Sequence, residues 1–424
     1  MKKSLLLGLA ICFLHTCFAQ SPTTQVNTEE TLRRVADRIV ANTTFRFLNN
    51  KTGQRLESTE GLAPTADIVT ESSYNKWGYP NGVMATGLMR MSNQLNDPKY
   101  ADYCRHNYRF IFDALPYFET VYKNTVAASP VSGAPIRTEF AGLFKMGNLD
   151  NCGAMAAGLT DVYMVDARKD YRAYLKRAGD YILHQQMRLS DGTLCRPDPR
   201  QGTVWADDLY MSVPFLARMG KVTGEKKYYD DAIRQIENFT RYLYDPTTGL
   251  FYHCYYSEIG LNGVAHWGRA NGWVAVSQVE LLANLPINHP KRKALITLLL
   301  RDITGFSRWQ DQSGLWHQLL DKNDSYLETS VTAMYVYAIA RAVNEGWIDR
   351  GYINVARQGW RALAGKITAD GQMPDVCVGT GISEDLRFYY TRPTPLNDTH
   401  GLGAFLLAGT EMLKFEKNNP GRKP

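Results

Sequence analysis

The sequence lacks the features that define several large classes of protein. After its first residues, no apolar stretch approaches the roughly 20 residues that a membrane helix needs. No run of Lys or Arg forms a basic stripe for nucleic acid, and the charge is modest, with 48 Lys and Arg against 42 Asp and Glu. We therefore expect neither a membrane span nor a nucleic-acid partner.

Cysteine is also scarce. There are 7 cysteines in 424 residues, and no two have C-x-x-C spacing. This argues against a disulfide framework and against a structural zinc site, and it predicts buried free thiols. The chain has no Gly-rich phosphate loop, no H-E-x-x-H and no G-x-S-x-G motif, which removes three common kinds of catalytic site.

The N-terminus has the pattern of a secretory signal peptide. Lys2 and Lys3 precede a short apolar run, Leu5 to Leu14, and Cys17-Phe18-Ala19 offers a small-x-small cleavage site. We therefore predict a signal peptide over 1–19 and export, with the periplasm as the expected location. Lipid attachment at Cys17 is the alternative, although Thr16 before it is unfavourable. Cleavage would remove two Lys and no acids, so the charge of +6 becomes 6 − 2 = +4.

The rest of the chain, 20–424, contains no linker rich in Pro, Ser or Gly, which predicts a single domain. Two kinds of helical segment alternate along it. One kind is amphipathic, as in 226–243, and the other is apolar nearly all round, as in 151–167, so that it must be buried on both sides. The predicted helices lie near 27–48, 80–95, 98–115, 151–167, 169–188, 208–221, 226–243, 270–284, 290–304, 326–346, 350–366 and 399–416.

This alternation predicts an all-α fold, an (α/α)6 barrel of six helical hairpins. The buried-type helices recur at about 55 to 75 residues, as a repeat of hairpins would give. An inner ring of these helices inside an outer amphipathic ring satisfies both burial patterns. Short strand pairs are expected in the loops at 249–253 and 314–317.

The loops that lead into the inner helices are long and rich in aromatic and charged residues, so we expect a site where they meet at one end of the barrel. Asp150 lies at one such loop end, where it could simply cap the next helix. Trp205, Asp207 and Asp208 lie at another. A helix cap needs only one of two adjacent carboxylates, so that Asp207 is left over if Asp208 caps the helix. The charge of Asp208 and the ring of Trp205 would then raise the pKa of Asp207, as a general acid needs.

Further candidates are aromatic and basic. Trp267 could stack on a sugar, and Arg269 offers a fork for a carboxylate, or it could merely pair with Asp150 or Asp207 across the ring. His253 lies in an aromatic hairpin, where a lone histidine is more often structural. The remaining candidates for substrate contacts are Trp77, Tyr79 and Arg392.

Four motifs, taken in order, resemble glycoside hydrolase family 105, the unsaturated rhamnogalacturonyl hydrolases, and their relatives, the family 88 unsaturated glucuronyl hydrolases. They are Trp205-Ala-Asp-Asp-Leu-Tyr-Met211, Trp267-Gly-Arg-Ala-Asn-Gly-Trp273, Gly314-Leu-Trp-His-Gln318 and His400-Gly-Leu-Gly-Ala-Phe405. The resemblance extends from about Ala36 to Leu413 and implies the same (α/α)6 barrel.

The resemblance also implies an activity. Such enzymes hydrate the C4=C5 double bond that a polysaccharide lyase leaves on a non-reducing uronic acid, and they need no metal or organic cofactor. The family's catalytic Asp corresponds to Asp207 and its second active-site Asp to Asp150. A stacking Trp corresponds to Trp267 and a substrate-binding Arg to Arg269, with His253 and Tyr79 as looser matches.

The expected partner is therefore an oligosaccharide with a terminal unsaturated uronic acid, and pectin-derived rhamnogalacturonan is the expected source. Unsaturated glucuronides of arabinogalactan or glycosaminoglycans are the alternative. Two rivals remain open, an inverting hydrolase of saturated glycans with Asp150 and Asp207 as its pair, and a non-catalytic glycan-binding protein. The sequence does not determine the oligomeric state.

Overall fold

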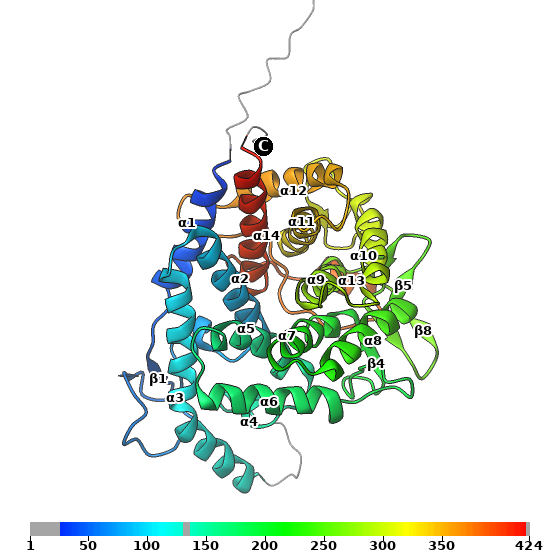
Figure 1. Ribbon diagram of the computed structural model, residues 1–424. Coiled ribbons are helices and arrows are strands. Elements are labelled where there is room, and N and C mark those ends of the chain that lie inside the picture. The colour runs from blue at the N-terminus through cyan, green and yellow to red at the C-terminus, as the bar shows by residue number, and fades with distance from the viewer. Residues whose placement is uncertain (1–25, 130–135, 421–424) are drawn as a thin grey trace, which may run out of the picture.

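The computed structural model describes residues 26–129 and 136–420, and these residues form two concentric rings of helices (Figure 1). The inner ring consists of α2 (Tyr79–Leu95), α5 (Gly153–Tyr163), α7 (Val213–Thr223), α9 (Gly268–Asn284), α11 (Thr329–Asn344) and α14 (Thr399–Asn418). Consecutive inner helices pack against each other, and α14 closes the ring against α2. The predicted signal peptide, 1–19, lies outside the described residues.

The outer ring consists of α1 (Thr28–Ala41), α3 (Lys99–Ala128), α6 (Lys169–His184), α8 (Lys226–Leu243), α10 (Arg292–Ser307) and α12 (Ile353–Lys366). Each outer helix packs mainly on one inner helix, α1 on α14 and the others on the inner helix that precedes them in the chain. The predicted all-α (α/α)6 barrel of six helical hairpins is thus confirmed.

The burial of the two kinds of helix explains the arrangement. In α11 every residue from Thr329 to Ala340 is buried, whereas α8 buries one face. Small residues let the inner helices approach closely. A Cβ added to Gly82 of α2 would lie 2.3 Å from the carbonyl oxygen of Ala154 in α5. The all-round apolar segments are therefore inner helices because they have neighbours on every side.

Some boundaries differ from the prediction. The first helix ends at Ala41 rather than 48, because the chain continues into a small sheet of β1 (Phe47–Asn49), β2 (Arg55–Leu56) and β3 (Ile68–Thr70). Helix α3 continues past 115, through the exposed Pro116, because Phe118 beyond it packs on Phe47 and Phe140. Helix α7 begins at Val213 rather than 208, since Ala206–Leu209 forms a 3-10 turn.

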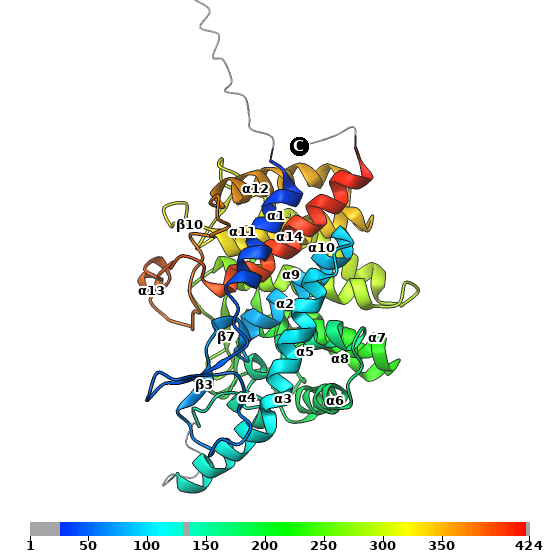
Figure 2. The ribbon, with the colours of Figure 1, turned by 90° about the vertical axis from the view of Figure 1, so that its left-hand side faces the viewer.

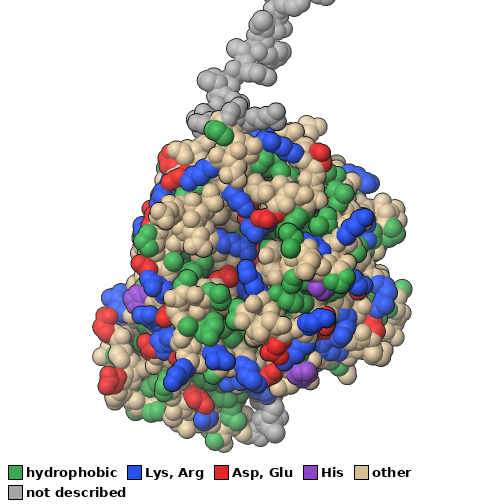
Figure 3. Space-filling view, viewed as in Figure 1, with side chains coloured by type: hydrophobic (Ala, Val, Ile, Leu, Met, Phe, Trp, Pro, Cys, Tyr) green, Lys and Arg blue, Asp and Glu red, His purple; other side chains and the backbone are tan. Residues whose placement is uncertain are grey.

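The barrel end formed by the C-terminal halves of the inner helices is closed by a charged network. Glu280 of α9 accepts from Arg90 of α2 at 2.7 Å and pairs with Arg218 of α7 at 2.9 Å. Arg218 also holds Asp161 of α5 by two hydrogen bonds. Burial raises the pKa of Glu280, but Arg90 and Arg218 outweigh it and hold the pKa well below its usual range. Figure 3 views this end, where Lys and Arg side chains are interspersed with Asp and Glu.

The loops that enter the inner helices gather at the other end of the barrel. Figure 2 shows β3, β7, β10 and the short helix α13 (Leu386–Tyr390) on one side of the helical rings. Here β4 (Thr203–Trp205), β7 (Cys254–Tyr256) and β8 (Leu261–Asn262) form one antiparallel sheet, in which Trp205 pairs with Cys254. The expected short strand pairs are β5 (Tyr244–Asp245) with β6 (Leu250–Phe251), and β9 (Trp316–His317) with β10 (Leu327–Glu328). A one-turn helix, α4 (Ala141–Phe144), lies in the loop before α5.

The state of the cysteines matches the prediction made from the sequence. All five cysteines of the described residues are buried and free, as predicted: Cys104, Cys152, Cys195, Cys254 and Cys377. Across 26–129 and 136–420, no helix combines the length and the apolar character of a membrane span.

Candidate functional site

Asp150 and Asp208 are joined by an arginine that the sequence analysis did not single out. Arg196 donates to both oxygens of Asp150, at 2.9 and 3.0 Å, and to both oxygens of Asp208, at 2.7 to 3.1 Å. Its guanidinium carbon lies 4.1 Å from the centre of the Trp205 ring. Every guanidinium nitrogen of Arg196 is therefore engaged by one or both carboxylates.

This bridge replaces the helix cap considered for Asp150. Asp150 belongs to a 3-10 turn, Leu149–Asn151, and its side chain does not cap α5, whose first residue follows Cys152. The Asp150 side chain keeps 29% of its exposure, whereas that of Asp208 has none. Of the two, only Asp150 is accessible to a ligand.

Asp207 faces His253 on the neighbouring loop. Its Oδ2 lies 3.1 Å from His253 Nε2, and apart from this contact neither atom has a hydrogen-bond partner among the described residues. The other ring nitrogen of His253 lies 2.9 Å from the hydroxyl of Tyr389 in α13. Buried polar atoms without a full set of partners are rare and often mark sites of function.

The pKa pattern of the two adjacent carboxyls differs from the expectation. Burial raises the pKa of Asp207, but His253, Arg196 and Arg269 outweigh it, so the pKa is lowered from its ordinary value. Burial raises the pKa of Asp208 to about 6; Arg196 opposes the shift, while the charges of Asp150 and Asp207 add to it. The prediction of a raised pKa at Asp207 was therefore wrong, because His253 and two arginines lie near its carboxylate.

Tyr79 and Trp205 border the same space. Tyr79 begins α2, and its phenol interacts electrostatically with Arg269, Asp150, Asp207 and Arg196; burial keeps its pKa well above the usual range. Trp205 is 7% exposed, and its indole N–H has no hydrogen-bond partner within the described part of the chain. Both residues can therefore offer a donor to a ligand beside Asp150 and Asp207.

Trp267 and Arg269 lie deeper than expected. Trp267 is 1% exposed and donates to Gln318 at 3.1 Å, so its ring is not an open platform for a sugar. Arg269 is fully buried and donates to the carbonyl oxygens of Cys377 and Val378, the latter at 2.6 Å. Arg269 thus pairs with neither Asp150 nor Asp207, the alternative considered from the sequence.

Trp267 and Arg269 are covered by the segment 376–392, which is part of the loop between α12 and α14. Besides the two bonds from Arg269, it is held by Tyr389 on His253 and by Arg392, which donates to Gly379 O at 2.5 Å and to Thr380 Oγ1 at 3.1 Å. A Cβ on Gly379 would lie 3.3 Å from His400, and one on Gly381 would lie 3.9 Å from Trp205. The segment therefore forms one wall of the site, and Arg392 lies in that wall.

Trp77 supports the site from behind. Its ring meets Tyr108, Phe112 and Tyr174 of the outer helices edge to face, and its N–H donates to Asn151 O at 2.9 Å. Trp77 thus contacts the turn that carries Asp150, and its contact with substrate stays a prediction.

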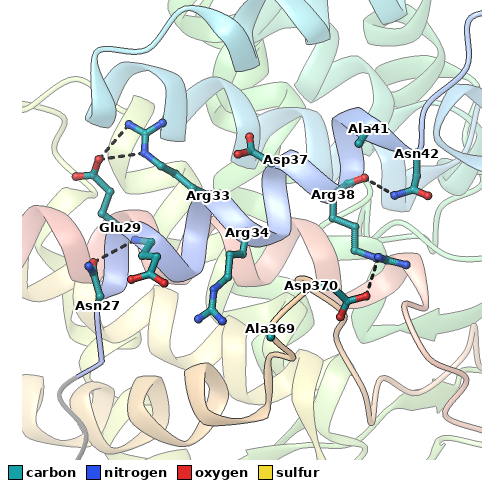
Figure 4. A pocket seen from close by; sticks show the side chains of 11 residues that line it. Asn27, Glu29, Arg33, Arg34, Asp37, Arg38, Ala41, Asn42, Ala369 and Asp370 are labelled. Carbon is teal, nitrogen blue, oxygen red and sulfur yellow. Dashed lines mark hydrogen bonds and ion pairs between the residues drawn. The ribbon is translucent and has the colours of Figure 1, made fainter.

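A hollow of about 740 Å³ beside α1 is unrelated to this site (Figure 4). It is lined by residues of α1, by its caps Asn27 and Asn42, and by Ala369 and Asp370, and none of the predicted site residues borders it. Its Arg33 and Arg38 are already paired with Glu29 and Asp370. In the described part of the chain, no three His, Cys, Asp or Glu side chains are grouped as metal ligands.

Comparison with known proteins gives a consistent result. A family model described as Glycosyl Hydrolase Family 88 matches residues 58–416. The chain is 31% identical over 256 residues to the unsaturated rhamnogalacturonyl hydrolase YesR of Bacillus subtilis, covering 58% of this chain and 72% of that protein. It is 32% identical over 221 residues to an unsaturated 3S-rhamnoglycuronyl hydrolase of an Alteromonas species, where it spans about half of the relative (50% of this chain, 52% of that protein).

Solved structures agree in fold. A possible member of family 105 from Salmonella enterica has a TM-score of 0.74 at 23% identity, with 96% of this chain and 100% of that chain covered. A family 105 glycoside hydrolase from C. acetobutylicum has a TM-score of 0.70 at 25% identity, with 91% and 99% covered. The helical rings described above are therefore shared along nearly the whole of these chains.

Proposed function

Because the chain belongs to Glycosyl Hydrolase Family 88 and is a glycoside hydrolase, we propose that it removes a terminal unsaturated galacturonyl residue from rhamnogalacturonan oligosaccharides by hydrating the C4=C5 double bond. The predicted resemblance to family 105, a relative of family 88, is confirmed. The observation that carries the substrate class is the 31% identity to the Bacillus subtilis unsaturated rhamnogalacturonyl hydrolase.

The geometry supports Asp207 as the residue that moves the proton. Asp207 gives a proton to C4, positive charge develops at C5 beside the ring oxygen, and water adds to C5 as Asp207 takes a proton back. The hemiketal then opens to a C5 ketone, and the hemiacetal left at C1 expels the aglycone alcohol. One carboxyl serves both steps, so no proton is gained or lost overall.

The lowered pKa of Asp207 fits this cycle once substrate is considered. In the free enzyme His253 and the arginines favour the ionised carboxylate. A bound uronate adds a negative charge beside it, which raises the pKa of Asp207, as like charges do. Binding of the correct acidic sugar therefore loads the proton that the first step needs.

The other groups divide into contacts and supports. Asp150, Tyr79 and the indole N–H of Trp205 are accessible or unpartnered beside Asp207, and we assign them to the sugar. Arg392 lies in the wall formed by 376–392, where it can meet the uronate carboxylate. Trp267 and Arg269 act from behind, by packing against His253 and by holding that wall.

The test is a substrate panel. The purified protein should abolish the ultraviolet absorbance of the conjugated double bond in lyase-treated rhamnogalacturonan. Unchanged absorbance with pectin-, arabinogalactan- and glycosaminoglycan-derived unsaturated oligosaccharides would refute the proposal. Unsaturated rhamnoglycuronyl oligosaccharides belong in the panel, because two relatives of 30 to 32% identity carry that name. Preference for them over rhamnogalacturonan would revise the aglycone and leave the chemistry in place.

We further propose that the mature protein is a single catalytic domain after a signal peptide over 1–19, exported to the periplasm. The support is the Lys2-Lys3 start, the short apolar run and the small-x-small site. N-terminal sequencing of the exported protein should begin at Gln20. A lipid-modified Cys17 as the first residue would favour an anchored form instead.

A further inference from the structure

The bridge between Asp150 and Asp208 goes beyond the residues assigned to the sugar. Arg196 lies in the loop before β4, Asp150 in the turn before α5, and Asp208 in the turn before α7. The arginine thus connects the entrances of two adjacent inner helices, through two hydrogen bonds to Asp150 and three to Asp208.

Several observations show that Arg196 serves the protein rather than a ligand. All three of its nitrogens donate to carboxylates, and one face of its guanidinium lies against Trp205. Asp208 has no exposed side-chain surface, so it cannot touch a substrate. A sugar carboxylate could form a bidentate pair with Arg196 only if one aspartate were released, because four of its five N–H groups already donate to Asp150 and Asp208.

We propose that Asp208 and Arg196 are positioning residues, which fix the carboxylate of Asp150 toward the sugar beside Asp207. Asp208 anchors the buried side of the Arg196 guanidinium. The guanidinium in turn binds both oxygens of Asp150, and such a bidentate pair holds the carboxylate in one orientation. The adjacent Asp207 is left free to face His253. The kinetic test of this inference rests on the proposed hydratase function, whereas the structural test does not.

Charge balance supports the same division. Asp150, Asp207 and Asp208 bring three carboxylates to the site, and Arg196 contacts the first and the last of them. A buried charge persists only when it is paired and hydrogen-bonded. Arg196 meets that requirement for two of the three carboxylates at once.

The main test is Arg196→Lys, which keeps the charge and removes the fork. Because one ammonium cannot hold both carboxylates in plane, Asp150 should shift, and a misplacement near 1 Å costs about 100-fold in kcat. We expect KM to change by less than about threefold, since Arg196 does not contact the sugar. A raised KM at unchanged kcat would mean that Arg196 binds substrate and would overturn the proposal, as would wild-type kinetics.

The matched control is Arg218→Lys. Arg218 also forms a partly buried two-bond pair with an aspartate, Asp161, between the same helices α5 and α7 at the opposite end of the barrel. Arg218→Lys should lose stability as Arg196→Lys does, but it should keep kcat within about twofold, because Arg218 lies far from the candidate site. An equal loss of kcat in both variants would reduce the role of Arg196 to general stability.

Two more readouts separate positioning from folding. In an Asp150→Asn background, Arg196→Lys should cost less than about threefold further in kcat, because the two residues act through one contact. Asp208→Asn should lower kcat with KM within about threefold of wild type, because an amide replaces the carboxylate that anchors the guanidinium. Additive losses, or wild-type kinetics in a folded Asp208→Asn variant, would contradict the proposal.

Failure of this inference differs from failure of the proposed function. If the wild type turns over no unsaturated substrate, the function fails. The positioning claim is then decided by a crystal structure of Arg196→Lys. The positioning claim predicts a rotated or displaced Asp150 carboxylate in that structure, and an unmoved Asp150 would overturn the claim.

Discussion

Replacing Asp207 by Asn tests the assigned proton transfer most sharply. Asn has the shape of Asp and leaves the backbone turn Ala206–Leu209 undisturbed, but it cannot give a proton to C4. The His253 side chain that faces it has no exposure, and that of Asp207 has 13%, so water has little room to replace the carboxylate. The chemical step should fail while the binding groups remain.

The magnitude follows from the role. General acid–base catalysis by one positioned group is worth about 10² to 10⁴ in rate. At 1.36 kcal/mol for each factor of ten, that is about 3 to 5 kcal/mol of transition-state stabilisation. Because Asp207 serves as both acid and base here, and is screened from solvent, we expect a loss at the upper end, near 10⁴ in kcat.

The assay is the decay of ultraviolet absorbance with lyase-treated rhamnogalacturonan, together with calorimetric binding of the same oligosaccharide. Asp207→Asn should bind it within about fivefold of wild type, since the group lost acts in the transition state. Asp161→Asn is the control, an aspartate at the opposite end of the barrel that should keep full kcat. Turnover of Asp207→Asn within about tenfold of wild type would refute the role given to this residue.

Three further predictions concern stability. Glu280→Gln should lower the free energy of unfolding by about 3 to 5 kcal/mol in urea titration, because the buried Arg218 and the partly buried Arg90 lose their common partner; a loss under 1 kcal/mol would contradict it. Gly153→Ala should destabilise strongly, because its Cβ would lie 1.6 Å from the carbonyl oxygen of Met211. Gly365→Ala should be neutral or stabilising, because among the described residues its Cβ would meet no atom within 4 Å outside its chain neighbours and its own helix backbone. Burial raises the pKa of Asp302 to about 6, so the folded state holds a proton that the unfolded state releases near pH 4, and stability falls as pH rises from about 4 to 6. Asp302→Asn should therefore raise Tm relative to wild type at pH 8 and not at pH 4.

The fold could be predicted because burial leaves a local record in the sequence. A helix such as α11, apolar on every side, fits only inside a ring, and α8, apolar on one face, fits only outside it. Helix boundaries depend on contacts between residues that are distant in the sequence. Nothing local indicates that α3 continues through Pro116, since the cause is the packing of Phe118 on β1 and on Phe140.

The site could be predicted only in part, for the same reason. Asp150 and Asp207 stood out because loops into inner helices meet at one end. Arg196 did not, because its partner Asp150 is 46 residues away and the bridge depends on the approach of two loops. The burial of Arg269 depends on residues 108 and 109 positions later in the chain, which cover it. Contacts between residues so far apart in the chain leave no pattern in a single sequence.

The central claim is hydration of the double bond, and a proton NMR time course in D₂O with an unsaturated rhamnogalacturonan disaccharide and its saturated counterpart tests it directly. We predict that the signal of the C4 hydrogen of the double bond disappears as the aglycone is released, that the first product carries deuterium at C4, and that the saturated disaccharide is untouched. Cleavage of the saturated disaccharide, or a first product that keeps its C4=C5 bond, would contradict the account.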